Sequence, residues 1–88
     1  MNVIMYGILI CPDCEEALAL LQKEEKIQVD FRDFNLLTTN IKEFLKLRDT
    51  NSMFDEIREA GNIGIPLFVF EDGSMTFNVQ EVIDIANQ

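Results

Sequence analysis

The first 34 residues contain three patterned segments in direct succession, and their order restricts the fold more than any other feature. Residues 2–10 are almost continuously apolar, which is typical of a strand that is buried on both faces. The next apolar residues recur with the spacing of one helix face: Cys14, Ala17, Leu18 and Leu21. Residues 27–34 then alternate apolar and polar side chains, as a strand does. These patterns predict a β-α-β unit with parallel strands and a right-handed crossover.

The middle of the chain predicts a helix in two pieces. Asn40 and Glu43 have the spacing of a capping box, in which the two side chains satisfy free backbone donors at a helix start. Apolar residues at helical spacing follow them. The polar residues 50–52 interrupt this helix, and Ser52 is expected to cap the second piece. That piece is predicted to end at Ala60-Gly61.

The last third of the chain predicts a hairpin followed by a final helix. The apolar residues 66–70 lead into Asp72-Gly73, which is a strong signal for a hairpin turn. Residues 74–77 alternate again and are predicted to form the returning strand. Asn78, together with Glu81, is a further predicted helix cap.

The complete predicted order, β-α-β-α-β-β-α, corresponds to an α/β fold with a mixed four-stranded sheet flanked by helices. The chain has 88 residues, which is too short for two domains, so residues 1–88 are expected to form a single domain. The net charge of −9 argues against nucleic acid and anionic membrane surfaces as partners. A cytoplasmic location is expected, because the apolar start lacks the basic region of a signal peptide and no run reaches ~18 apolar residues.

The segment Cys11-Pro12-Asp13-Cys14 puts two thiols one helical turn apart, where the first strand gives way to a helix. Proline is tolerated best in the first turn of a helix, so Cys11 is expected at the N-cap. The unpaired N–H groups and the dipole of the helix favour its thiolate form there. Cys14 heads the apolar stripe and is expected to be more buried. The spacing therefore predicts that Cys11 attacks a disulfide and that Cys14 resolves the mixed disulfide.

Other interpretations of the two cysteines have less support from the residues. A structural zinc site normally takes four ligands. The chain has no histidine and no third cysteine, so zinc would need carboxylates or a second subunit, and no metal is expected. The absence of histidine also excludes cysteine–histidine nucleophilic catalysis. Core packing alone would accept both cysteines without requiring their spacing.

The dithiol at a predicted helix start, with Gly64-Ile65-Pro66 ahead of a hairpin and a last helix, resembles the glutaredoxins and the wider thioredoxin superfamily. The resemblance covers essentially the whole chain and implies a thioredoxin-like fold. It also implies that Cys11 and Cys14 are catalytic and that the Ile65–Pro66 bond is cis. Pro66 would then lie across from the attacking cysteine. Ile65, Pro66 and Pro12 would contact the bound substrate.

The glutathione contacts of glutaredoxins are poorly matched in this chain. Ile8 stands where a basic residue is usual, Asp13 stands where tyrosine is common, and residues 77–79 lack a glycine pair. Asp13, Glu15 and Glu16 surround the dithiol with negative charge, whereas glutathione is itself an anion. No bound cofactor is expected. High affinity for glutathione is not expected, and the sequence leaves open whether glutathione or a thioredoxin-reductase-type enzyme is the electron donor. The same carboxylates predict a reducing dithiol, with a potential nearer ~ −270 mV than ~ −120 mV.

We therefore predict a thiol–disulfide oxidoreductase that acts on a disulfide-containing protein or a low-molecular-weight thiol substrate. The alternative is a redox-responsive interaction module on the same fold, without turnover. Oxyanion reduction of the arsenate-reductase type would need an arginine near the thiol, and the nearest in sequence is Arg32, on the next strand. Three other bases, Lys42, Lys46 and Arg48, are interpreted as a solvated helix face.

Overall fold

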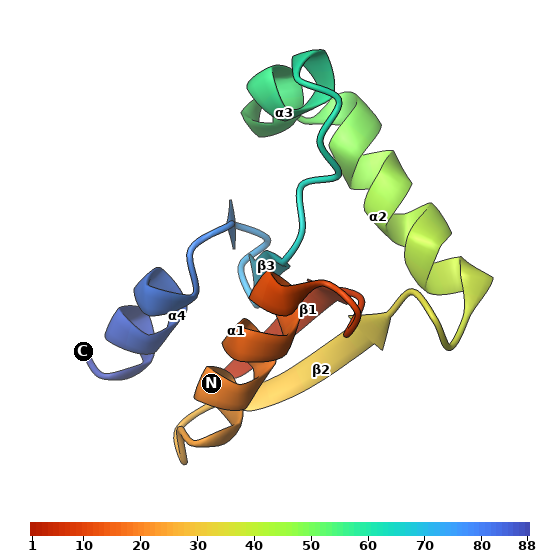
Figure 1. Ribbon diagram of the computed structural model, residues 1–88. Coiled ribbons are helices and arrows are strands. Elements are labelled where there is room, and N and C mark those ends of the chain that lie inside the picture. Colours follow the sequence, from red (N-terminus) through yellow and green to blue (C-terminus); the bar gives the residue numbers. More distant parts are fainter.

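The computed structural model describes residues 1–88 and has a four-stranded sheet with helices on its two faces (Figure 1). In chain order the elements are β1 (Asn2–Gly7), α1 (Pro12–Gln22), β2 (Gln28–Asp33), α2 (Thr38–Thr50), the 3₁₀ turn η1 (Ser52–Phe54), α3 (Asp55–Glu59), β3 (Leu67–Phe70), β4 (Met75–Thr76) and α4 (Val79–Ala86). The strands lie in the order β2-β1-β3-β4. β1 is parallel to β2 and antiparallel to β3, so the predicted mixed sheet is confirmed.

The predicted second helical piece is present as η1 and α3, so the element order differs from the predicted β-α-β-α-β-β-α, in which the two pieces count as one helix. The backbone becomes extended at Asn51, and the Oδ1 atom of Asn51 accepts a hydrogen bond from the N–H of Met53 at 3.0 Å. Asn51, and not Ser52, therefore caps the next turn. The guanidinium of Arg58 donates to the carbonyl oxygens of Arg48 and Asn51. These hydrogen bonds satisfy carbonyl oxygens at the end of α2, where the helix has no further N–H donors, and they connect α3 to α2.

Side chains of the central strands divide between two cores, because successive residues of a strand point to opposite faces. Val3 and Met5 of β1 pack under α1 and α4 on one face. Tyr6 of β1 packs on the other face against Phe44 of α2 and Phe54 of η1. Figure 1 shows α1 lying across β1 and β2, with α2 and α3 away from it. The sheet is thus covered on both sides, which explains the nearly continuous apolar sequence of β1.

β1 ends at Gly7, three residues before its predicted end. Residues 8–10 form a turn in which the N–H of Cys11 donates to the carbonyl oxygen of Ile8 at 3.1 Å. The side chain of Ile10 is 87% exposed, so the apolar sequence continues past the buried strand onto the surface. The chain must leave the sheet here, because α1 begins at Pro12 and crosses the sheet from that point.

The predicted capping box at Asn40 and Glu43 is wrong. α2 begins at Thr38 with Leu37 at the N-cap, so Asn40 lies inside the first turn. The side chain of Asn40 is buried, and its amide donates to the carbonyl oxygen of Asp33 at 2.9 Å. A buried amide needs such a partner, and the last residue of β2 supplies it here.

The caps of the last helix follow the prediction in part. Asn78 is the N-cap of α4, and its Oδ1 atom accepts a hydrogen bond from the N–H of Gln80 at 2.9 Å. Glu81 does not complete the box, since its Oε2 atom accepts from the hydroxyl of Thr76 at 2.9 Å. No helix in the structure combines the length and the apolar character that crossing a membrane requires.

Candidate functional site

Cys11 occupies the N-cap of α1, as predicted. Its backbone is extended, with φ −84° and ψ 119°, and Pro12 follows in the first turn. No side chain caps this helix end, so backbone N–H groups of the first turn remain without a side-chain acceptor. Cys11 is partly exposed, Cys14 is buried, and both thiols are free. The predicted asymmetry of the pair, with only the first sulfur accessible, is therefore confirmed.

Cys14 lies in the core between α1 and the sheet. Burial raises the pKa of its thiol to about 11, a backbone hydrogen bond with Ile8 acts in the opposite direction, and the neighbouring Cys11 adds to the rise. A Cβ atom built on Gly7 would lie 2.7 Å from the Sγ atom of Cys14, so only glycine fits at that point of β1. The buried thiol therefore stays protonated at neutral pH and is held against the end of the strand.

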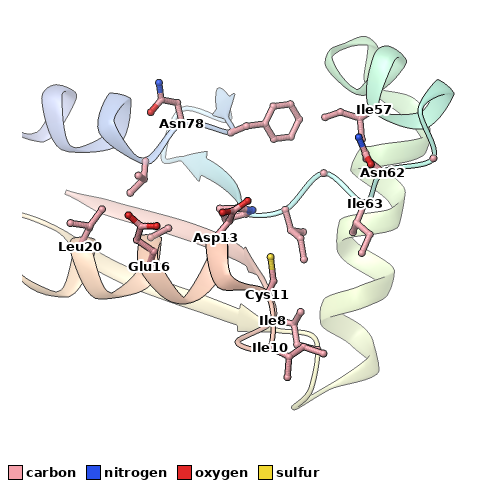
Figure 2. Close-up of a pocket in the computed structure, with 17 residues that line it drawn as sticks. Ile8, Ile10, Cys11, Asp13, Glu16, Leu20, Ile57, Asn62, Ile63 and Asn78 are labelled. Atoms are coloured by element: carbon pink, nitrogen blue, oxygen red, sulfur yellow. The ribbon is translucent and has the colours of Figure 1, made fainter.

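Cys11 opens into a groove with a volume of about 1140 Å³. The walls come from the β1–α1 loop and α1, from the segment 57–66, and from residues 77–79. Figure 2 shows the sulfur of Cys11 pointing toward the segment that leads to β3. Ile65 and Pro66 line the groove together with Cys11, and the peptide bond between them is cis, as the resemblance implies. Pro12 is exposed and does not line the groove.

The charges of the groove are all negative. Ten of its 17 lining residues are hydrophobic, and Asp13 and Glu16 are the only charged ones. Glu15 is exposed but does not line the groove, so one of the three carboxylates in this part of α1 faces elsewhere. Neither lysine nor arginine lines the groove, and it therefore has no cation with which to bind a carboxylate or an oxyanion.

The segment ahead of Pro66 is held by an arginine that sequence reasoning misread. Arg48 of α2 donates from Nε to the carbonyl oxygen of Ile63 at 3.0 Å and from Nη2 to that of Asn62 at 2.7 Å. The interpretation of Arg48 as part of a solvated face is therefore wrong, whereas Lys42 and Lys46 are exposed as expected. No sequence pattern marks the Arg48 contacts, because 14 or 15 residues separate the partners.

Arg32 lies away from the thiols and forms a different cluster. It pairs with Asp30 at 2.8 Å and with Glu43 at 2.7 Å, and Glu43 also accepts a hydrogen bond from the hydroxyl of Tyr6 at 3.0 Å. Burial and the bond to Glu43 raise the pKa of Tyr6 to about 12. Arg32 does not line the groove, so it is not placed to serve as the arginine that oxyanion reduction would need near the thiol. No group of three or more histidine, cysteine, aspartate or glutamate side chains could hold a metal ion.

Comparison with known proteins identifies a similar sequence. A protein of Haemophilus influenzae, described as uncharacterized, is 27% identical over 81 residues. The similar region covers 90% of this chain and 91% of the relative, so it extends over nearly the full length of both. No family model matches the chain. No solved structure matches it either.

Proposed function

We propose that this protein is a glutaredoxin-like thiol–disulfide oxidoreductase with a thioredoxin-like fold. One observation carries the proposal: the partly exposed Cys11 at the start of α1 shares a groove with Pro66, while Cys14 is buried one turn behind it. An accessible sulfur at a helix N-terminus is suited to attack, and a second sulfur nearby is suited to resolve the product. The strand order β2-β1-β3-β4 and the β-α-β unit at the start of the chain support the fold assignment.

The proposed reaction has two exchange steps. The thiolate of Cys11 attacks one sulfur of the substrate disulfide, forms a mixed disulfide and releases the other substrate sulfur as a thiolate, which takes up a proton. The thiol of Cys14 then loses its proton and attacks the Sγ atom of Cys11. The second substrate sulfur leaves and is protonated, and the protein retains a Cys11–Cys14 disulfide. Two electrons have passed to the substrate, and an external thiol or a reductase must return them.

The burial of Cys14 explains why Cys11 attacks the substrate first and Cys14 reacts only with the mixed disulfide. A thiol whose pKa is about 11 is rarely ionised at neutral pH, so Cys14 is a weak competitor for the substrate. Once Cys11 is in a mixed disulfide, the sulfur that Cys14 attacks lies one helical turn away. Reaction within one molecule then compensates for the small thiolate fraction.

A turnover assay tests this function directly. Hydroxyethyl disulfide is the substrate, and the electron donors are glutathione with glutathione reductase or, separately, NADPH with a thioredoxin reductase. We expect the Cys11→Ser variant to lose turnover with both donors. Incubated with hydroxyethyl disulfide in the absence of a donor, the Cys14→Ser variant should retain the first step and accumulate a mixed disulfide at Cys11 that mass spectrometry detects. Full turnover by the Cys11→Ser variant would end the proposal.

The second candidate function is a redox-responsive interaction module without turnover. It is favoured by apolar side chains that remain exposed close to Cys11, namely Ile10 at 87% and Ile63 at 58%. In that case the dithiol would oxidise and would alter binding of a protein partner, but neither donor would sustain turnover. Rapid cycling with either donor excludes this candidate. A cytoplasmic location fits both candidates, because thiols are kept reduced in that compartment.

A further inference from the structure

The groove around Cys11 has an apolar side and an acidic side. Figure 2 shows Asp13 and Glu16 on the part of α1 that faces α4, whereas Ile8 and Ile10 lie on the other side of the cysteine. This division follows from the chain, because Ile8 and Ile10 precede Cys11 in the loop, and Asp13 and Glu16 follow it along one face of α1. A ligand extended through the groove would therefore meet apolar groups before the sulfur and carboxylates after it.

The two carboxylates are available to a ligand. Neither Asp13 nor Glu16 forms an ion pair, whereas carboxylates elsewhere in the protein pair with Arg32, Arg48 and Arg58. No basic residue lines the groove to neutralise them. Both carboxylates are therefore free to interact with a cation that enters the groove.

The apolar side is an independent indication of a ligand. Ile10 and Ile63 come from segments far apart in sequence, line the same groove and remain largely exposed. Exposed apolar side chains grouped at a concave site usually mark a binding surface. The groove volume of about 1140 Å³ is large enough to accept a segment of polypeptide.

We propose that the groove selects polypeptide disulfides in which the reactive cysteine has an apolar residue on one side and lysine or arginine on the other. The inference rests on the proposed function, because the two exchange steps at Cys11 and Cys14 are the same. It adds the substrate class: a cationic protein segment is accepted, and an anionic partner such as oxidised glutathione is disfavoured. Charge complementarity of this kind acts mainly on the rate of association.

Matched peptides test the selection. Each peptide has one cysteine in a mixed disulfide with neutral thiopyridine, preceded by leucine and followed by lysine, alanine or glutamate. The fully reduced protein is used in excess, so that it supplies both electrons and no donor is needed. Release of thiopyridone is followed by absorbance. We expect the lysine peptide to react about tenfold faster than the glutamate peptide at low salt, and the ratio to shrink as salt screens the carboxylates.

Variants of α1 identify the source of the selectivity. Glu16→Gln and Asp13→Asn should each lower the lysine-to-glutamate rate ratio about two- to fivefold. Glu15→Gln is the matched control, because it removes the same charge from the same helix at a residue that does not line the groove. It should leave the ratio nearly unchanged. Circular dichroism of each variant checks that α1 remains folded.

A second pair of variants tests the apolar side. Ile63→Ser should slow the reaction of all three peptides and leave the lysine-to-glutamate rate ratio intact, whereas Ile85→Ser, at an exposed isoleucine outside the groove, should change neither. Equal rates for the lysine and glutamate peptides would overturn the inferred selectivity while the proposed function stands. An equal effect of Glu15→Gln and Glu16→Gln would overturn it as well. Failure to release thiopyridone from any peptide would instead overturn the proposed function and, with it, this inference.

Discussion

The Nε atom of Arg48 lies 3.0 Å from the carbonyl oxygen of Ile63, and this contact ties α2 to the segment that carries Pro66. A second hydrogen bond, from Nη2 to the carbonyl oxygen of Asn62, measures 2.7 Å. The guanidinium thus holds two consecutive carbonyl groups with its planar set of donors, which an ammonium group cannot match. The wall of the groove opposite Cys11 depends on a residue of another element.

Replacing Arg48 should loosen that wall. We expect Arg48→Lys to lower the rate of disulfide reduction and to reduce the free energy of unfolding by about 1–2 kcal/mol, since an ammonium group cannot reproduce the two hydrogen bonds of the planar guanidinium. The rate loss should appear mainly as a higher KM, because the thiols themselves are unchanged. Urea unfolding and steady-state kinetics measure the two effects. Lys46→Gln removes a positive charge from the same helix at an exposed position and is the control.

The close approach of Gly7 to Cys14 predicts a coupled pair of substitutions. Gly7→Ala should destabilise the protein by about 1–3 kcal/mol, because its Cβ atom would lie 2.7 Å from the Sγ atom of Cys14. Once the sulfur is removed in Cys14→Ala, the nearest remaining atoms are the Cβ atom of residue 14 at 3.4 Å and a ring carbon of Phe31 at 3.8 Å. The alanine at position 7 should then fit.

A double-mutant cycle measures this coupling. The Gly7→Ala/Cys14→Ala protein should be more stable than the sum of the two single changes predicts, by about 1 kcal/mol or more in urea unfolding. If the two changes in the free energy of unfolding are additive, the end of β1 can shift to accept the new Cβ atom without loss of stability. The packing of Cys14 would then not depend on Gly7.

Stability should fall in alkali through two buried groups. Burial raises the pKa of Cys14 from 9.0 to about 11 and that of Tyr6 from 10.0 to about 12. Below pH 9 both groups are protonated in the folded and the unfolded chain, so their contribution is complete. Above that pH the unfolded chain releases the Cys14 proton first, while the folded protein retains it. The free energy of unfolding should therefore decrease between about pH 9 and 11, by at most about 2 kcal/mol for Cys14.

Two variants separate the contributions of these groups. Cys14→Ala should flatten the pH dependence between about pH 9 and 11, and Tyr6→Phe should flatten it between about pH 10 and 12. Urea unfolding at a series of pH values gives the slopes. An undiminished slope in the Cys14→Ala protein would show that the thiol is not the group responsible.

The carboxylate of Asp13 should affect the redox potential of the dithiol. Asp13 lies in the first turn of α1, between the two cysteines, and opposes the positive end of the helix. Asp13→Asn should stabilise the reduced thiolate and shift the potential about 10–20 mV in the oxidising direction. Equilibration with a glutathione redox buffer measures the shift. Glu25→Gln, at an exposed residue beyond the other end of α1, should leave the potential unchanged, and a shift of equal size there would refute a local effect.

Much of the fold was predictable because its signals are local. The helix spacing from Cys14 to Leu21, the alternation of β2 and the Asp72-Gly73 turn each depend on neighbouring residues, and the structure has the corresponding elements. The N-cap position of Cys11 follows from Pro12 in the same way, since a proline restricts the backbone wherever the chain later folds. The predicted burial of Cys14 also follows from its place on the apolar helix face.

Two of the misjudged residues, Glu43 and Arg48, have partners far away in sequence. The spacing of Glu43 predicts a capping residue, but its carboxylate accepts a hydrogen bond from the hydroxyl of Tyr6, which lies 37 residues earlier. The sequence predicts that Arg48 is a solvated base, but its guanidinium donates a hydrogen bond to the carbonyl oxygen of Ile63, 15 residues later. The apolar sequence predicts that Ile10 ends the first strand, but β1 ends at Gly7 and Ile10 lies in the turn that follows. Side chains take their hydrogen-bond partners and packing neighbours from residues that the tertiary structure brings close. The spacing of residues along the chain does not predict these neighbours.

The sequence by itself determined a mixed α/β fold and two thiols of unequal exposure at the start of α1, because hydrophobic period and proline geometry act over a few residues. Only the tertiary structure decided what faces the exposed thiol. It brought Ile63 and Pro66 to one groove with Cys11, and it directed Asp13 and Glu16, but not Glu15, into that groove. Packing of α1 against the sheet fixes the rotation of the helix about its axis, and that rotation selects the side chains that a bound substrate would meet.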